Sequence, residues 1–342
     1  MHKENNFDFL RFFLSSLVIV SHSYPLTGSP EILASNTNEQ ATLGDIAVNA
    51  FFVLSGFLIL TSLKRSKSPI EYLVKRGLRL FPALFFMLLF SLLIIRIVYK
   101  GNNILNEPLF FTYLPNNFFL YNVQYYVTGV FDANPYPQAI NGSLWTLSYE
   151  FSMYLFVLLL YPIRKNAYTL SAGLVASFLI CYYAMNLKPD LFASFLWSVK
   201  LVPHLFYRLA IFFIAGCLLS LVKPDQLQKL NKPYIKIALL LLLAASFPLQ
   251  LFYSSSPFVL SLLIILVAIS YSKQLAYLPQ KMGDISYGIY IYGFLVQQTL
   301  MNYHNFPPLQ LTILSLIVTY ALSYLSWHLI EKRFLKLKQR LR

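Results

Sequence analysis

Long apolar runs recur along the chain, each separated from the next by polar or charged residues. A run of about twenty apolar residues, wound as a helix, matches the thickness of the hydrocarbon core of a bilayer. The runs cover residues 8–26, 45–63, 79–99, 143–163, 167–187, 203–222, 234–253, 257–273, 285–302 and 309–331. The pattern therefore predicts an all-α fold, a polytopic bundle of about ten transmembrane helices.

The composition supports this fold and excludes an ordinary soluble domain. The 342 residues are 57% hydrophobic and only 12% charged, whereas roughly a quarter of the residues of a soluble domain are charged. Beside so many spans the length leaves no room for a second large domain, so residues 1–342 are expected to form a single membrane domain without a fused soluble one. No small-residue cleavage site follows the first run, which predicts an uncleaved helix.

The basic residues are distributed unevenly between the two sides of the predicted bundle. With the N-terminus in the cytoplasm, the inner segments carry all but five of the 27 lysines and arginines. The five on the outer side are Arg96, Lys100, Lys188, Lys200 and Arg208. This asymmetry follows the positive-inside rule and predicts that both termini are cytoplasmic. The net charge of +14 is then explained by topology, and no nucleic-acid partner is expected.

Two outer segments, residues 27–44 and 101–142, are long and polar. The second is rich in Asn and in aromatic residues. Amides bond to hydroxyl groups and aromatic faces pack on pyranose rings, so this segment is a candidate for binding a sugar acceptor. The alternative is that its aromatics form a belt at the membrane interface.

One Arg and one His lie in the first apolar run. Arg11 and His22 are eleven residues apart, which places both side chains on one helix face, about 16 Å apart along the axis. Such residues are costly in lipid unless they face protein or water, so His22 is a candidate functional residue. Asp45 and Glu150 are its candidate carboxylate partners. The alternative for Glu150 is an ion pair between helices, for example with Arg208.

A second basic cluster begins the third run. Arg76 and Arg79 lie three residues apart on one helix face, and paired guanidinium groups suit phosphates. The alternative is ordinary cytoplasmic charge. The sequence has no Gly-rich phosphate loop and no His/Cys spacing typical of a metal site, so no metal is expected.

Several short motifs follow one another along nearly the whole chain, and together they resemble the membrane acyltransferase-3 family. They are Phe7 to Arg11 with His22, the Phe-rich Ser-Gly helix at residues 51–59, Arg76 and Arg79 before Pro82, the Trp/Glu block at residues 143–151, Ser286 to Tyr292, and His328 to Lys332. Each motif is weak alone, and their order and spacing are more specific.

The resemblance implies acyl transfer from a cytoplasmic acyl-CoA, commonly acetyl-CoA, to a hydroxyl of a surface polysaccharide or lipid-linked glycan. The expected partners are membrane lipids, the acyl-CoA and the glycan, in a bacterial inner membrane, with no permanently bound cofactor. Arg11, Arg76 and Arg79 would bind the donor. His22 would act as general base or as an acyl-carrying nucleophile, and Glu150 would orient it. The acyl or acceptor pocket is expected to contain Asp45, Ser143, Trp145 and Ser148.

One position departs from the family pattern. Relatives often have His where this chain has Gly293, between Tyr292 and Phe294. Any role of that histidine is absent here or taken over elsewhere, for example by His304. The alternative function is a secondary transporter or flippase for a small solute or lipid-linked sugar. A transporter should show inverted repeats or paired broken helices, and the sequence shows neither.

Overall fold

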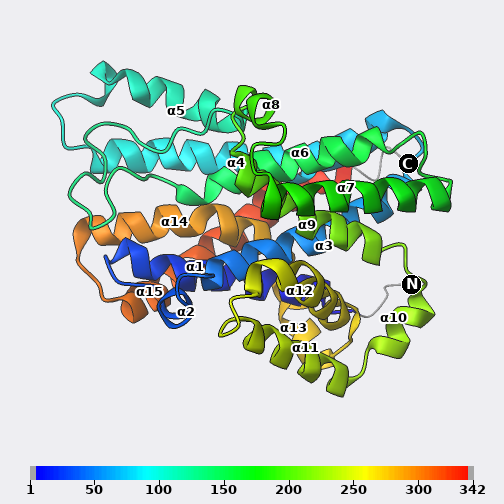
Figure 1. Cartoon of the computed structure of the whole chain (residues 1–342). Coiled ribbons are helices and arrows are strands. Elements are labelled where there is room, and N and C mark those ends of the chain that lie inside the picture. The colour runs from blue at the N-terminus through cyan, green and yellow to red at the C-terminus, as the bar shows by residue number, and fades with distance from the viewer. Residues whose placement is uncertain (1–4, 338–342) are drawn as a thin grey trace.

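The computed structural model describes residues 5–337, and throughout these residues the regular structure is helical. Figure 1 shows most of the long helices running side by side in one bundle. The elements are α1 (Phe7–Leu26), α2 (Ile32–Asn36), α3 (Leu43–Arg65), α4 (Pro69–Val98), η1 (Ile104–Asn106), α5 (Pro108–Phe118), η2 (Gly142–Leu144), α6 (Trp145–Leu159), α7 (Ala167–Leu187), α8 (Ala193–Ser198), α9 (Pro203–Leu219), α10 (Pro224–Leu230), α11 (Pro233–Ser246), α12 (Phe252–Ile269), α13 (Lys273–Met282), α14 (Ser286–Tyr303), α15 (Pro308–Ser326), the π-helical η3 (Trp327–Glu331) and α16 (Lys332–Leu337). The basic residues Lys3, Lys338, Arg340 and Arg342, which the sequence assigns to the cytoplasm, lie outside the described residues.

Each predicted span corresponds to a helix, but the helices differ in their fitness to cross a bilayer. Within residues 5–337, six helices are long and apolar enough: α1, α3, α4, α7, α12 and the continuous stretch from α15 to α16. A seventh is counted if α9 and α10, which meet at 109°, form one broken span. The helices α6 and α11 have 15 and 14 residues and are shorter than a typical span. A multi-pass helical bundle is confirmed, whereas the count of ten and the cytoplasmic termini stay predictions.

The helices α3 and α9 pack backbone against backbone at two glycines. A Cβ atom on Gly56 would lie 1.9 Å from the carbonyl oxygen of Phe213, and one on Gly216 would lie 2.0 Å from the carbonyl oxygen of Val53. Small residues allow this close approach. In lipid, where the hydrophobic effect does not drive helices together, van der Waals packing at such contacts stabilises the helix pair. The pair forms part of the main core.

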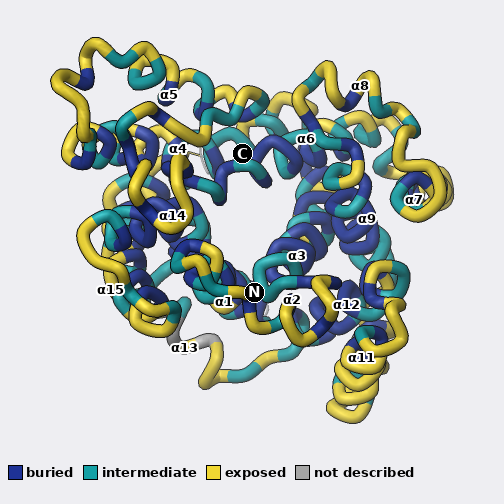
Figure 2. The backbone as a smooth tube through the Cα atoms, turned by 60° about the vertical axis from the view of Figure 1, so that its left-hand side comes forward, coloured by how far each residue is buried: buried dark blue, intermediate teal, exposed yellow. Residues whose placement is uncertain are grey.

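The helices α1, α3, α4, α6 and α14 surround the centre of the bundle, as Figure 2 shows. Many residues of these helices are buried, while α7 and α11 lie at the outside with many exposed apolar side chains. Examples are Leu179 and Ile180 on α7 and Leu241 and Leu242 on α11, each about half exposed or more. Exposed leucines and isoleucines on outer helices suit contact with lipid.

The long segment between α4 and α6 folds back on the bundle and is fastened there by amides. Asn134 donates to the side chain of Gln298 (2.7 Å), and Gln298 in turn donates to the carbonyl oxygens of Tyr136 and Ala139. Asn141 donates to the carbonyl oxygen of Ile291 (2.7 Å). These three amides therefore hold the segment against α14, a structural role that the sequence interpretation of sugar binding did not include.

Candidate functional site

A cavity of about 300 Å³ lies inside the ring formed by α1, α3, α4, α6 and α14, with one residue of α16 at its wall. Its charged lining residues are Arg11, Arg76, Arg79, Glu150 and Asp284. The first four were predicted from the sequence as site residues, and the fold brings them into one space. Apolar side chains of α3 and aromatic side chains of α14 form much of the remaining wall.

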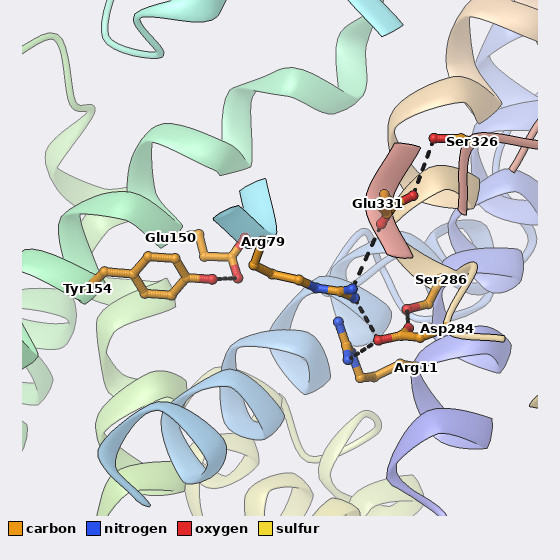
Figure 3. A network of polar contacts seen from close by, with 8 residues as sticks. All are labelled: Arg11, Arg79, Glu150, Tyr154, Asp284, Ser286, Ser326 and Glu331. Carbon is orange, nitrogen blue, oxygen red and sulfur yellow. Dashed lines mark hydrogen bonds and ion pairs between the residues drawn. The ribbon is translucent and has the colours of Figure 1, made fainter. Parts of the chain in front are cut away.

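Asp284 connects the two helices that carry Arg11 and Arg79. Its Oδ2 accepts hydrogen bonds from Nη1 of Arg11 (3.0 Å) and from Nη2 of Arg79 (2.7 Å), as Figure 3 shows. Its Oδ1 accepts from Ser286 Oγ at the start of α14 (2.7 Å). One carboxylate thus joins α1, α4 and α14 through charge-assisted bonds.

The charge of Asp284 is maintained by its two arginine partners. Burial by itself would raise the pKa of this carboxyl, but the guanidinium groups of Arg11 and Arg79 outweigh burial and hold the pKa well below its usual value. Asp284 therefore stays ionised throughout the physiological pH range, and the two arginines keep their counter-charge.

Arg79 has a second carboxylate partner at the far end of the chain. Its Nη1 lies 3.8 Å from Oε2 of Glu331, a side chain that is only 2% exposed. Glu331 ends the π-helical turn η3, and its Oε1 accepts from Ser326 Oγ (3.3 Å). A π-turn displaces side chains from the regular helical positions and is frequent at functional sites. Here it accompanies a buried carboxylate directed at the arginine (Figure 3).

Gly283 allows the turn that carries Asp284. Its φ of +86° lies in the left-handed region that favours glycine. A Cβ atom at this position would also lie 2.1 Å from Nε1 of Trp327, so the turn packs directly against η3. Trp327 and Gly283 together fix the positions from which Glu331 and Asp284 reach Arg79.

Glu150 lies elsewhere in the cavity, on α6. Its Oε1 accepts hydrogen bonds from Tyr154 Oη and from Ser55 Oγ, the latter at 3.2 Å. The ion pair with Arg208 considered from the sequence is wrong, because Arg208 pairs with Asp45 instead (3.1 Å). Within the described residues Glu150 makes no hydrogen bond to His22, so its expected orienting role is not part of this arrangement.

His22 is not one of the residues that line the cavity. Its ring contacts the ring of Phe294 edge to face, with centroids 5.2 Å apart. Phe294 is one helical turn along α14 from Tyr290, which lines the cavity and shares a hydrogen bond with Thr146 across it (2.6 Å). Nδ1 of His22 is buried and has no hydrogen-bond partner within residues 5–337.

The four remaining predicted pocket residues do not line this cavity. Asp45 caps α3 through Thr42 besides pairing with Arg208, and it lines a separate, smaller pocket. Ser148 Oγ donates to the carbonyl oxygen of Trp145, whose ring packs on Tyr149. Ser143 is buried beside Asn141. Their assignment to an acyl or acceptor pocket stays a prediction.

Sequence reasoning missed Asp284, Glu331, Thr146 and Tyr290. All but Asp284 stand inside motifs that were recognised: Thr146 next to Trp145, Tyr290 in the Ser-Tyr-Gly stretch, and Glu331 between His328 and Lys332. Asp284 could have been suspected as an acid directly before an apolar run, and Glu331 as an acid at the end of one. Which arginine each would contact depends on packing between distant segments.

At Gly293, where the family resemblance implies that His is common, Ile19 of α1 occupies the space beside α14. A Cβ atom at this position would lie 2.7 Å from Cγ1 of Ile19 on α1. The glycine therefore allows α1 and α14 to approach closely. His304, the suggested substitute, is exposed after the end of α14, where its ring contacts Phe306.

One family and two proteins are similar to this chain over nearly its whole length. Residues 4–328 match the family model described as "Acyltransferase domain". An "O-acetyl transferase" of Shigella phage Sf6 is 30% identical over 351 aligned positions, which cover 98% of this chain and 97% of that protein. "Nodulation protein 10" of Rhizobium leguminosarum bv. viciae is 28% identical over 379 positions, covering 98% and 94%. No solved structure matches.

Proposed function

Since this chain belongs to the acyltransferase-3 family, we propose that it transfers an acetyl group from cytoplasmic acetyl-CoA to a hydroxyl of a surface polysaccharide or lipid-linked glycan. That the protein is a membrane O-acetyltransferase follows from the family and from its similarity to the phage O-acetyl transferase over nearly the full length of both chains. The donor, the acceptor and the bacterial inner membrane belong to the proposal.

The single observation that carries the proposal is the polarity of the central cavity. Its basic end holds Arg11, Arg76 and Arg79, at chain positions that the positive-inside pattern assigns to the cytoplasm. Apolar residues of α3 form the middle of the wall, and His22 lies past the other end. Phosphates suit the basic end, and a short acyl group attached to a flexible arm suits the apolar wall.

The transfer requires only groups that this chain and the two substrates supply. The acceptor hydroxyl oxygen attacks the thioester carbonyl carbon, the C–S bond breaks, and CoA leaves as a thiol. The proton of the hydroxyl passes to the departing sulfur. His22, through Nε2, would accept that proton as general base, or would carry the acetyl group between donor and acceptor. Family membership favours this reaction over the transporter considered from the sequence.

Sealed membrane vesicles of opposite orientation test the sidedness of the reaction. Inside-out vesicles, which present the cytoplasmic face, are expected to consume added [¹⁴C]acetyl-CoA and to label glycan, because the basic end of the cavity then faces the medium. Right-side-out vesicles are expected to do so only after permeabilisation. Equal labelling by intact vesicles of both orientations would contradict a cytoplasmic donor site, and vesicles lacking the protein give the background.

A further inference from the structure

Gln297 on α14 is a fully buried amide that bonds to the turn of α1 carrying His22. Its Nε2 donates to the carbonyl oxygen of Ile19 (2.9 Å) and to Ser23 Oγ (2.8 Å), and the residue is 0% exposed. Because a carbonyl oxygen only accepts, the atom of this amide that faces Ile19 must be the nitrogen. The oxygen, Oε1, is buried and has no hydrogen-bond partner among residues 5–337.

The hydroxyl groups that bond in this network have no proton left for Oε1 of Gln297. Ser23 Oγ donates its proton to the carbonyl oxygen of Ile19 (3.0 Å). It accepts from Gln297 Nε2 and from Thr312 Oγ1, the latter at 2.8 Å, so the proton of Thr312 is used as well. An acceptor left unpaired in the interior is costly, and the donor for Oε1 must therefore come from another neighbour.

His22 offers such a donor on the same turn of α1. It follows Ile19 by three residues, and in a helix the side chain of residue i stands beside the carbonyl group of residue i−3. Its Nδ1, the ring nitrogen nearer the backbone, is likewise buried and unpartnered in the described part of the chain. Phe294, whose ring meets that of His22, is one turn before Gln297 on α14. Two unsatisfied and complementary groups thus lie at one contact between α1 and α14.

We propose that Gln297 is a positioning residue for His22, with its Oε1 accepting a hydrogen bond from Nδ1–H of the imidazole. The ring reaches Oε1 by turning about χ2, a torsion with a broad energy well. A neutral imidazole that carries its proton on Nδ1 presents its lone pair on Nε2. That lone pair takes the proton of the acceptor hydroxyl or forms the bond to the acetyl group. The inference rests on the proposed function, because it assigns the tautomer and orientation of the same histidine.

An amide in this position acts differently from a carboxylate. Asp45 and Glu150, the carboxylates expected beside His22, are bonded to other residues. A neutral oxygen fixes the tautomer without placing a second ionisable group in the apolar part of the bundle, where a charge is costly. Gln297 therefore orients the imidazole and does not supply a counter-charge to an imidazolium.

Nitrogen NMR of the full-length protein, labelled with ¹⁵N-histidine, tests the tautomer without any substrate. We expect His22 to carry its proton on Nδ1 at neutral pH, with its signals identified by their loss in His22→Ala. Gln297→Met keeps the length of the side chain and removes both polar atoms, so it should yield a mixture of the two tautomers. A proton on Nε2 in the wild-type protein, or an unchanged tautomer in Gln297→Met, would overturn the inference.

The kinetic constants separate positioning from helix packing. For Gln297→Met we expect kcat to fall about 10- to 100-fold, the loss found when the partner that orients a functional histidine is removed from a metal site. The KM values for acetyl-CoA and for the acceptor should stay unchanged. Thr312→Val is the matched control, since it breaks a buried bond between α15 and α1 without touching Oε1. It should lower the melting temperature in detergent and leave kcat near the wild-type value.

Ser315 provides a second control, because its Oγ is a buried hydroxyl on α15 without a partner among residues 5–337. Ser315→Ala should change neither the tautomer of His22 nor kcat. A changed tautomer in Ser315→Ala, or equal losses of kcat in Gln297→Met and Thr312→Val, would reduce Gln297 to a packing residue. A wild-type protein with the expected tautomer that uses no thioester would instead refute the proposed function, so the two failures are distinguishable.

Discussion

The His22→Ala variant is expected to lose acetyl transfer while remaining folded in the membrane. His22 lies on α1, and its ring contacts Phe294 of α14, one helical turn from the cavity residue Tyr290. Loss of a general base costs about 10²- to 10⁴-fold in rate, and loss of an acyl-carrying nucleophile costs at least as much. Glycan labelling from [¹⁴C]acetyl-CoA measures the activity, and a monodisperse elution in detergent measures folding.

His204→Ala is the matched control for this prediction. His204 is exposed near the start of α9 and does not line the cavity. Its loss should leave labelling at the wild-type rate. If a well-folded His22→Ala protein transferred acetyl at the wild-type rate, neither role of the imidazole would be tenable.

Alanine at Gly56 or Gly216 is expected to prevent α3 and α9 from packing. The added Cβ is itself the obstacle, since it would lie about 2 Å from a carbonyl oxygen of the partner helix. A backbone oxygen cannot move without separating the helices, so we expect a loss of about 4 kcal/mol or more, at the upper end of point substitutions. The yield of monodisperse protein and its melting temperature in detergent are the measurements.

Gly173→Ala on α7 provides the same substitution without the obstacle. Its Cβ would have as nearest neighbour Cδ1 of Ile163 at 3.9 Å, an ordinary contact. Stability should therefore be unchanged or slightly higher, because alanine favours a helix. A Gly216→Ala protein as stable as Gly173→Ala would show that the two helices do not meet through their backbones.

The sequence predicts the site residues whose charged side chains would be costly to expose to lipid. Arg11, Arg76, Arg79 and Glu150 are charged residues in or beside apolar runs, and such residues are stable only where they face protein or water. Their convergence in one cavity was therefore predictable, although their individual partners were not. The helical architecture was predictable for the same reason, from long runs without charge.

The partners could not be predicted because they come from distant segments. Asp284 is 273 residues from Arg11 along the chain, and nothing local indicates that α1 and α14 place them together. Asp45 was expected near His22 but pairs with Arg208, because both lie at the same end of α3 and α9. The amides of the outer segment were expected to be free for sugars, yet Asn134 and Asn141 satisfy groups of α14.

The sequence predicts about ten spans, more than the number of helices in the described residues that are long and apolar enough to cross a bilayer. Hydropathy sums apolar residues whether or not the helix continues through them. The run at residues 143–163 gives only the 15 residues of α6, because the chain turns after Leu159. The run at residues 234–253 is likewise interrupted after Ser246.

We propose that this protein acetylates a glycan hydroxyl by way of His22. Mass analysis of the surface glycans of a strain lacking the gene tests it most directly, with complementation by the wild-type or the His22→Ala gene. We expect that the deletion removes the mass of one acetyl group from a glycan species, that the wild-type gene restores it, and that the His22→Ala gene does not. Glycan masses identical in all of these strains would contradict it.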